Sequence, residues 1–384
     1  MLFLSFSLAF QITQTNWEKN WLTVRSAIES RYYARISNKS KMEELLNRYE
    51  PQAKAAKDEA TFEKAVNDMI DEFKDSHFDL YTKSDQGYYV MDALTRGSIA
   101  LPMPNIGAWF AEGPDGYTVQ MLLENGEAAE AGLSKGDKVV KVDGLPFSPI
   151  QSFKGKKDKT VDLEFVHQGK TRKASVKVDE EDGGAFFLEG TRKSERMIEV
   201  NGKKYGYIHL WTMGDDAQKN ALAGAVYGKF KDTDGFILDI RDGFGGRPEG
   251  YGDPFFRPEI HLDWTMPNFL NHQLFGYQRP LVILINKGSR SAKEVFAYIM
   301  KKSGRATLIG EQTGGNVLGT SPMRLGDWGY LEIPAVDVSA DGDRLEKNGV
   351  APDVKVSREF DDSGKDLYID QAVKVLAEKL AAKK

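Results

Sequence analysis

Hydroxyl, imidazole and carboxylate groups are the side chains with which this sequence could carry out hydrolysis. The chain has no cysteine and only five histidines, which excludes disulfides, thiolate nucleophiles and cysteine-ligated metals. None of the histidines lies in the H-E-x-x-H arrangement of zinc peptidases. We therefore expect no metal and no cofactor, so that any hydrolysis must use a hydroxyl, carboxylates and a single histidine.

Ser291 is the hydroxyl with the most suggestive position. It follows an expected strand (281–286) and a short loop, and it directly precedes an amphipathic helix expected over 292–302. A hydroxyl there lies at the positive end of the helix dipole, which favours a developing negative charge. The pattern Ser291-x-x-Glu294 is also a capping box, and the flanking glycines of the α/β-hydrolase elbow are missing. Taken alone, the helix cap is the simpler interpretation.

His77 and Ser76 lie at an expected corner between a helix and a strand. The helix carries apolar residues at 62, 66, 69, 70 and 73, and residues 78–81 alternate like a strand. Side chains at such a corner can be aimed into a cleft. Glu346 stands in a polar turn before Gly349. Taken one at a time, a structural histidine and a solvated glutamate would explain both positions.

The elements expected around these residues change along the chain. Apolar residues at helical spacing predict helices near the N-terminus, and residues 100–180 have the short strands and glycine turns of a β domain. The last 200 residues alternate strands (206–211, 235–241, 281–286 and 306–310) with helices (216–230, 292–302 and 366–380). This alternation predicts a layered α/β core with buried strands.

The totals exclude several classes of protein. A chain of 384 residues suggests two or three domains. The net charge of -5 and the absence of a long basic run argue against a nucleic-acid partner. The segment Gly243-Phe-Gly245-Gly246-Arg-Pro248 has proline where the dinucleotide fingerprint needs its third glycine, and no phosphate-binding loop sequence occurs.

Residues 2–10 form a short apolar run that ends in Ser7-Leu8-Ala9, small residues at both positions that a signal peptidase reads. The run is too short to cross a bilayer, so an integral membrane protein is not expected. No positive residue precedes it. We expect an incomplete signal peptide and an exported protein (periplasmic or extracellular), with a buried N-terminal segment as the alternative.

Seven segments resemble motifs of one protein family and follow one another along the chain in the same order as in that family. Residues 126–144 resemble the signature of PDZ domains in bacterial proteases, and residues 17–375 as a whole resemble the C-terminal processing proteases, tricorn-core proteases and retinoid-binding modules. The other matching segments are residues 73–78, 206–208, 238–246, 289–294, 309–315 and 345–353.

The resemblance implies an α/β fold: a ClpP/crotonase-like catalytic core with an inserted PDZ-like β domain and an N-terminal helical segment. The expected boundaries are a signal segment at 1–11, the helical segment carrying Ser76-His77 at 12–95, the PDZ-like domain at 100–180 and the core at 181–384.

The resemblance also implies a mechanism. The processing-protease branch uses a serine–lysine dyad, but Asn316 occupies the lysine position here and an amide cannot take a proton from a hydroxyl. The tricorn-like branch uses Ser and His assisted by a second Ser and a Glu. These correspond to Ser291 as nucleophile, His77 as base, and Glu346 and Ser76 as the groups that orient the imidazole.

The implied oxyanion hole consists of backbone N–H groups of Gly245, Gly246 and Ala292, where a tight turn after the strand is the structural alternative. Peptide binding by strand addition is implied at Ile106-Gly107-Ala108, although this loop departs from the usual Gly-Leu-Gly-Phe form. A peptide or an unfolded protein is therefore the expected partner.

Two other functions are also compatible with the sequence. The retinoid-binding modules resemble the same core, so the chain could be a non-catalytic protein that binds a peptide or a lipophile. It could also be a scaffold that uses only its PDZ-like domain. The aromatic residues of the segment 247–279, expected to be irregular, either line the cleft or anchor the loop to the core: Phe255, Phe256, Trp264 and Phe269.

Overall fold

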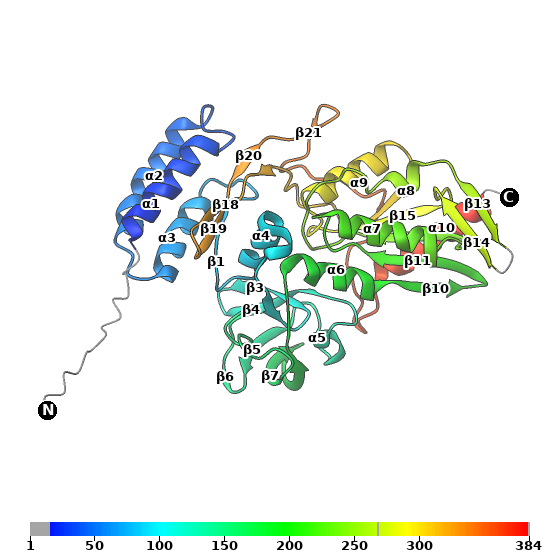
Figure 1. Cartoon of the computed structure of the whole chain (residues 1–384), viewed down its shortest axis with the longest axis horizontal. Helices are drawn as coiled ribbons and strands as arrows, with labels where there is room; N and C mark the ends of the chain where they lie inside the picture. The colour runs from blue at the N-terminus through cyan, green and yellow to red at the C-terminus, as the bar shows by residue number, and fades with distance from the viewer. Residues whose placement is uncertain (1–15, 267–268, 383–384) are drawn as a thin grey trace, which may run out of the picture.

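The structure is a computed structural model that describes residues 16–266 and 269–382. The predicted signal segment lies outside these residues, so export stays a prediction. Within the described ranges, no helix combines the length and the apolar character needed to cross a membrane. Figure 1 shows a group of helices (blue) at the left, a small β domain below, and an α/β layer at the right.

The N-terminal helices pack on a three-stranded sheet whose strands come from distant parts of the chain. β1 pairs with β19 and β19 with β18, all antiparallel, so that Leu80 lies opposite Leu331. Both leucines are buried among apolar side chains of the helices. The elements are α1 (Trp17–Arg31), α2 (Lys39–Lys54), α3 (Glu59–Asp71), β1 (Asp79–Thr82), β18 (Met323–Leu325) and β19 (Gly329–Glu332). The N-terminal segment is therefore tied to residues about 250 positions later, since Asp79 lies opposite Glu332 (332 − 79 = 253).

Two elements link this helical part to the rest of the molecule. α4 (Gln86–Arg96) is followed by a short 3-10 turn (Gly97–Ile99) and packs against α6 (Gly183–Ser194). Aromatic and apolar side chains of α4, α6, the β domain and the core form one buried cluster there. The helical part, the β domain and the core are therefore joined by apolar packing as well as by the chain.

The small β domain has an antiparallel sheet in the order β3-β4-β5-β7-β8, with β6 beside β5. Its interior contains Val119, Val139 and Phe165. A separate pair, β2 with β9, closes the domain where the chain enters and leaves it. The elements are β2 (Met103–Asn105), β3 (Ala108–Gly113), β4 (Gly116–Leu122), α5 (Glu127–Glu130), β5 (Lys138–Val142), β6 (Leu145–Pro146), β7 (Thr160–His167), β8 (Lys170–Lys177) and β9 (Asp179–Glu181).

The core is a six-stranded sheet in the order β10-β11-β12-β15-β16-β23, parallel except for β10. Both faces of its central strands are buried, which explains their continuous apolar sequences. The strands are β10 (Arg196–Val200), β11 (Lys203–His209), β12 (Gly235–Asp239), β15 (Leu281–Ile285), β16 (Thr307–Gly310) and β23 (Val354–Lys355). The strands and helices predicted from alternation are present, with ends shifted by a few residues.

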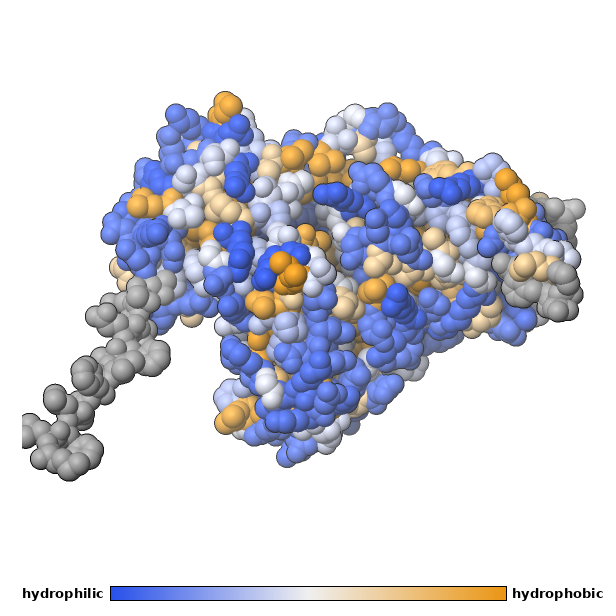
Figure 2. Space-filling model, in the orientation of Figure 1, coloured by the Kyte–Doolittle hydropathy of each residue, from blue (hydrophilic) through white to orange (hydrophobic). Residues whose placement is uncertain are grey.

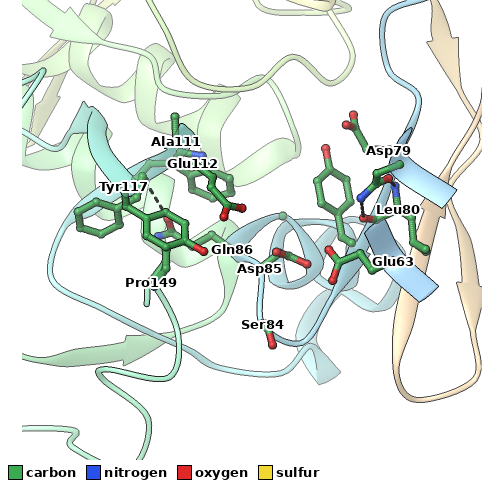
Figure 3. Close-up of a pocket in the computed structure, with 15 residues that line it drawn as sticks. Glu63, Asp79, Leu80, Ser84, Asp85, Gln86, Ala111, Glu112, Tyr117 and Pro149 are labelled. Carbon is green, nitrogen blue, oxygen red and sulfur yellow. Dashed lines mark hydrogen bonds between the residues drawn. The ribbon is translucent and has the colours of Figure 1, made fainter. Parts of the chain in front are cut away.

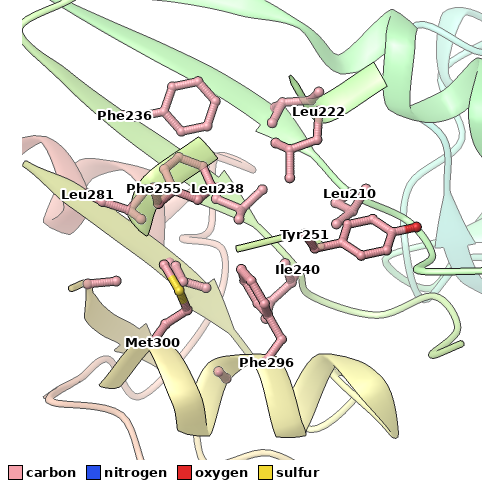
Figure 4. Close-up of a cluster of buried hydrophobic side chains, with 14 of the residues drawn as sticks. Leu210, Leu222, Phe236, Leu238, Ile240, Tyr251, Phe255, Leu281, Phe296 and Met300 are labelled. Carbon is pink, nitrogen blue, oxygen red and sulfur yellow. The ribbon is translucent and has the colours of Figure 1, made fainter. Parts of the chain in front are cut away.

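Helices cover the two faces of this sheet. On one face, Leu238 and Ile283 pack with Phe296 of α9 (Figure 4). On the other, Ile237 and Val282 pack against α10. The covering elements are α7 (Asp216–Gly224), the π-helical turn Ala225–Lys229, α9 (Ala292–Lys302) and α10 (Leu367–Ala381).

The segment 247–279 is more regular than predicted. It contains α8 (Asp253–Phe256) and an antiparallel hairpin of β13 (Ile260–Met266) and β14 (Phe269–Phe275). Phe255 is fully buried in the core, whereas Trp264 is 54% exposed on the hairpin and Phe256 is 47% exposed. The side chain of Phe269 lies outside the described residues. Of the two interpretations offered for these aromatic residues, anchoring to the core is correct for Phe255.

Two further short antiparallel pairs come from the C-terminal part of the chain. They are β17 (Gly319–Thr320) with β20 (Pro334–Val336), and β21 (Ser339–Ala340) with β22 (Asp343–Arg344). In the view of Figure 2 the surface is mostly hydrophilic with scattered hydrophobic side chains.

Truncating a buried side chain of the core should lower the stability of the protein. We expect Leu238→Ala to lower the free energy of unfolding by about 2–5 kcal/mol, because this side chain of β12 is fully buried in the cluster that contains Phe296 of α9, and its loss leaves a cavity. Leu145→Ala is the matched control, since Leu145 is 69% exposed. Urea unfolding followed by circular dichroism measures both. Equal losses for the two variants would contradict the burial described here.

Candidate active site

The corner that carries Ser76 and His77 is held in a strained backbone conformation. Lys74 and His77 both have positive φ, 62° and 58°, a region that side chains other than glycine seldom adopt. Asp75 between them accepts hydrogen bonds from the hydroxyls of Tyr32 (2.5 Å) and Tyr33 (3.3 Å). Lys347 Nζ lies 3.3 Å from the same carboxylate. The corner is thus fixed between α1 and the segment that contains Glu346.

Glu346, Ser76 and His77 form a chain of hydrogen bonds. The Ser76 hydroxyl lies 2.9 Å from Glu346 Oε2 and 2.9 Å from His77 Nδ1. Glu346 is 2% exposed, and its carboxylate also accepts from the backbone N–H of Val317 (2.7 Å) and of Ser76 (3.4 Å). A buried carboxylate needs such donors, and here two of them come from Ser76 itself.

The chemistry of these groups sets the tautomer of His77. A carboxylate only accepts hydrogen bonds, so the single Ser76 proton is directed to Glu346. The Ser76 oxygen must then accept from Nδ1–H of His77, which leaves Nε2 unprotonated. Nε2 is the atom that a general base needs.

Burial keeps the His77 imidazole neutral. His77 is 7% exposed, and desolvation, with a smaller contribution from the positive charge of Arg290, lowers its pKa from 6.5 to about 3. The ring is therefore uncharged near neutral pH, in the form that can take a proton.

Ser291 is the N-cap of α9 and has an unusual backbone conformation, with φ 58° and ψ -127°. Its backbone N–H donates to the carbonyl of Asn316 (2.7 Å) and to Glu294 Oε2 (3.3 Å). The expected helix cap is therefore present. The strained conformation at a cleft is a feature often associated with functional residues.

Gly245 lies against the side chain of Ser291. A Cβ atom added to Gly245 would be 2.3 Å from Ser291 Cβ, 2.7 Å from its Oγ and 2.9 Å from the Ala292 nitrogen. Only glycine allows this approach. Among the described residues, the backbone N–H groups of Gly246 and Ala292 donate to no acceptor, so the predicted oxyanion donors include free N–H groups beside the serine.

Lys293 supports the glycine segment and was missed by the sequence analysis. Its side chain is fully buried and donates to the carbonyls of Trp211 (2.8 Å) and Asp242 (2.7 Å). Burial lowers its pKa to about 7. The signal in the sequence was a charged residue on the apolar face of the predicted helix, one turn before Phe296 and Ala297.

His77 and Ser291 line one cleft, which has a volume of about 1110 Å³. Its lining includes His77, Ser291, Gly245 and Gly246, together with apolar residues of α4 and charged residues such as Arg290. Ser76 and Glu346 do not line the cleft but stand behind His77. Within the described ranges, no group of three or more His, Asp or Glu side chains could hold a metal ion.

The loop predicted to bind peptide ends is closed. Ile106, Gly107 and Ala108 are buried, and none of them lines a described cavity. The N–H of Gly107 already donates to the Asn105 side chain (2.9 Å), and the carbonyl of Ile106 accepts from Ala128 (2.9 Å). Peptide binding at this loop stays a prediction, without an open site to support it.

The β domain instead contacts the segment that precedes Gly245 and Gly246. Met121 Sδ accepts from the N–H of Gly243, Trp109 packs edge-on against Phe244 with ring centroids 5.1 Å apart, and Lys135 forms an ion pair with Asp242. The β domain therefore helps to position this segment.

Comparisons with known proteins agree with this geometry. Residues 265–356 match the sequence model of Peptidase family S41. A carboxyl-terminal-processing protease from Synechocystis sp. is 26% identical over 253 residues, which is 62% of this chain and 58% of that protein. A putative tricorn-like protease C-terminal subunit from Sulfurisphaera tokodaii is 27% identical over 263 residues, 65% of this chain and 30% of that protein. The chain thus matches 58% of the length of the first relative and 30% of the second.

Solved structures show the same fold. The photosystem II D1 C-terminal processing protease superposes with a TM-score of 0.55 at 21% identity, over 91% of this chain and 96% of that one. The tricorn protease gives a TM-score of 0.56 at 18% identity, over 95% of this chain and 37% of that one. The predicted α/β fold, with a ClpP/crotonase-like core and an inserted PDZ-like domain, is confirmed.

The low pKa of His77 should appear in the pH dependence of stability. Between about pH 6.5 and about pH 3, His77 is protonated in the unfolded chain but neutral in the folded protein. The free energy of unfolding therefore falls as the pH falls through this range. We expect His77→Gln to lose less unfolding free energy than the wild type on acidification. Asn316→Ala, beside Ser291 but without a titratable group, should keep the wild-type slope. Urea unfolding across this range tests this, and parallel curves for His77→Gln and wild type would refute it.

Proposed function

We propose that this chain, which belongs to peptidase family S41, hydrolyses peptide bonds with Ser291 as nucleophile and His77 as general base. One observation supports this above the others. The hydrogen-bonded chain from Glu346 through Ser76 to His77 ends in the cleft that Ser291 also lines. His77 and Ser291 are 214 residues apart, and nothing local in the sequence brings them together.

In the acylation step, Ser291 Oγ attacks the peptide carbonyl while its proton passes to His77 Nε2. The new Oγ–C bond gives a tetrahedral intermediate. When the C–N bond breaks, the imidazolium returns the proton to the leaving amine. Water then attacks the carbonyl of the acyl-enzyme while His77 Nε2 takes its proton. When the Oγ–C bond breaks, His77 returns the proton to Ser291 Oγ and the acid product is released.

Glu346 acts on this reaction through Ser76. As His77 becomes an imidazolium, its Nδ1–H bond to Ser76 Oγ carries more positive charge, and the Ser76 dipole is held by the Glu346 carboxylate. This is the task of the third member of a triad, carried out through an intervening hydroxyl. Because the Ser76 hydroxyl stands between the Glu346 carboxylate and the His77 ring, the carboxylate stabilises the imidazolium less than it would in direct contact.

The oxyanion would be stabilised by backbone N–H groups of Gly246 and Ala292, with Gly245 packed against the serine. Donors already in place cost no reorganisation during the reaction, and the loss of one such donor costs about 3 kcal/mol of barrier. Lys293 belongs to this arrangement as a positioning residue, because it holds the carbonyls of Trp211 and Asp242.

Peptides are the substrate class that this geometry supports. The cleft, at about 1110 Å³, has the volume to hold several residues, and its walls include both apolar and charged side chains. The similarity to a carboxyl-terminal-processing protease and to a tricorn-like protease subunit also supports a peptide or an unfolded protein as substrate. A non-catalytic peptide- or lipophile-binding protein is the alternative that the following experiments exclude or establish.

Ser291→Ala and His77→Ala should each abolish hydrolysis of a fluorogenic peptide library while the protein stays folded. Ser291→Ala removes the nucleophile, and His77→Ala removes its base. Asn316→Ala is the matched control, because its backbone, not its side chain, bonds to Ser291. Loss of activity in Asn316→Ala equal to that in Ser291→Ala, at unchanged stability, would overturn the assignment of the base.

Glu346→Gln should lower kcat by about 10- to 100-fold and change KM little, because the substitution keeps the shape but weakens the support of the imidazolium in the transition state. Ser76→Ala should have an effect of similar size, and the double variant should lose little more than either single variant, since both act in one chain. Full additivity of the two effects would show that Glu346 and Ser76 act independently.

A further inference from the structure

Two carboxyl groups stand directly opposite each other beside the proposed active site. Asp79 of β1 is the register partner of Glu332 of β19, so both side chains lie on the same face of the sheet. The next pair, Leu80 with Leu331, is buried against the N-terminal helices. Because side chains alternate between the faces of a strand, the two carboxyl groups point away from these helices. Like charges in such a pair destabilise a sheet, so this arrangement does not serve stability.

Glu332 is the member of the pair that lines the catalytic cleft. It does so together with His77 and Ser291, although it is only 4% exposed. Asp79 is not among the residues that line the cleft. Figure 3 shows it at the edge of a separate pocket of about 410 Å³. Glu332 therefore borders the space that a peptide held at Ser291 would fill.

Glu332 lacks the partners that buried carboxylates normally have. Among residues 16–266 and 269–382, it forms no ion pair and no hydrogen bond of ordinary length and angle. The other two buried glutamates of the site differ in this respect, because Glu294 accepts from the backbone N–H groups of Gly315 and Asn316, and Glu346 accepts from that of Val317. A buried carboxylate without such donors is costly unless a cation joins it.

Burial opposes the ionisation of both carboxyl groups. It raises the pKa of Glu332 to about 7 and that of Asp79 to about 6. The positive charge of Arg290 and the nearby hydroxyls of Thr320 and Tyr81 lower the pKa of Glu332, but they do not offset burial. A bound cation would favour the ionised forms and so gain the interaction that the folded protein does not supply.

Arg290 does not neutralise this pair. It lines the cleft directly before Ser291, and its guanidinium lies over the ring of Phe244, 5.5 Å from the centroid. It forms no ion pair with any carboxylate of the part of the chain that the structure describes. When both carboxyl groups are ionised they face a single guanidinium, so one negative charge remains for a ligand.

We propose that Glu332 is a specificity-determining residue of the cleft and binds a cationic group of the peptide close to the bond that is cleaved. This inference names a substrate preference and rests on the proposed function. The cation is an ammonium or guanidinium group, which a lysine or arginine side chain or a free peptide N-terminus can supply. Charge-assisted hydrogen bonds in a site shielded from water are strong and selective.

The first measurement uses internally quenched peptides with blocked ends. One residue at a time along an apolar sequence is replaced by lysine, glutamine or glutamate, and mass spectrometry locates the bond that is cut. At one position near this bond, we expect kcat/KM for lysine to exceed that for glutamine by about tenfold. A parallel set with free or acetylated N-termini identifies the source of the cation. A preference for the free terminus at equal rates for lysine and glutamine assigns the site to the peptide N-terminus.

Glu332→Gln should lower this preference to about one- to twofold, because a neutral amide cannot form the charged pair. Its urea unfolding midpoint should be unchanged or higher, since the substitution removes an unpaired buried carboxylate. A merely structural role would give a lower midpoint and an unchanged preference. Glu249→Gln is the matched control. It removes the same charge from an exposed residue of the same cleft and should keep the preference, because solvent screens that charge.

Equal rates for all three substitutions and for both kinds of N-terminus would overturn the proposal, as would a preference that survives in Glu332→Gln. A preference for glutamate would also overturn it and would assign recognition to Arg290. If the wild type cleaves no peptide, the proposed peptidase function fails on its own. Fluorescence anisotropy of labelled lysine and glutamine peptides with the Ser291→Ala protein then decides whether Glu332 binds the cation, since binding needs no catalysis.

Discussion

The hydrogen-bonded chain of Glu346, Ser76 and His77 is the interaction on which the arrangement of this molecule depends. The carboxylate is 2% exposed, and a buried charge is tolerated only when its hydrogen-bond donors are in place. Its donors come from Ser76 and Val317, far apart in sequence. The helix–strand corner, the strand pair β1–β19 and the turn before Gly349 must therefore all be correctly placed before the carboxylate can be buried.

Strain at two positions is held by the surrounding packing. His77 and Ser291 both have positive φ, and each such residue costs about 1–3 kcal/mol. Asp75 with its tyrosine partners fixes the first, while Asn316 and Glu294 fix the second through the backbone N–H of Ser291. The glycine at 245 removes the Cβ that would otherwise displace the serine. The site is thus a set of constrained side chains on rigid elements, which is what precise positioning requires.

The sequence predicts much of this arrangement because the relevant patterns are local. The strand–loop–helix context of Ser291, the corner at His77 and the alternation of the core can be read within windows of a few residues. The pairing of β1 with β19 could not be predicted, since it depends on contacts between distant segments. The position of Lys293 on the apolar face of its helix marks it as unusual, but its carbonyl partners could not be predicted for the same reason. Likewise, Gln86 gives no sign in the sequence that its amide covers a strand edge. The loop at Ile106–Ala108 has the sequence position of a peptide-binding loop, but the N–H of Gly107 already donates to the Asn105 side chain.

An active-site-directed fluorophosphonate tests the central claim most directly, because it reacts with an activated serine hydroxyl and not with an ordinary one. The folded protein is treated with the probe, digested and analysed by mass spectrometry. We predict modification of Ser291 alone, with labelling lost in His77→Ala and after unfolding in urea. Labelling that is absent from Ser291, or that persists unchanged in His77→Ala, would contradict it and would favour a non-catalytic binding protein on this fold.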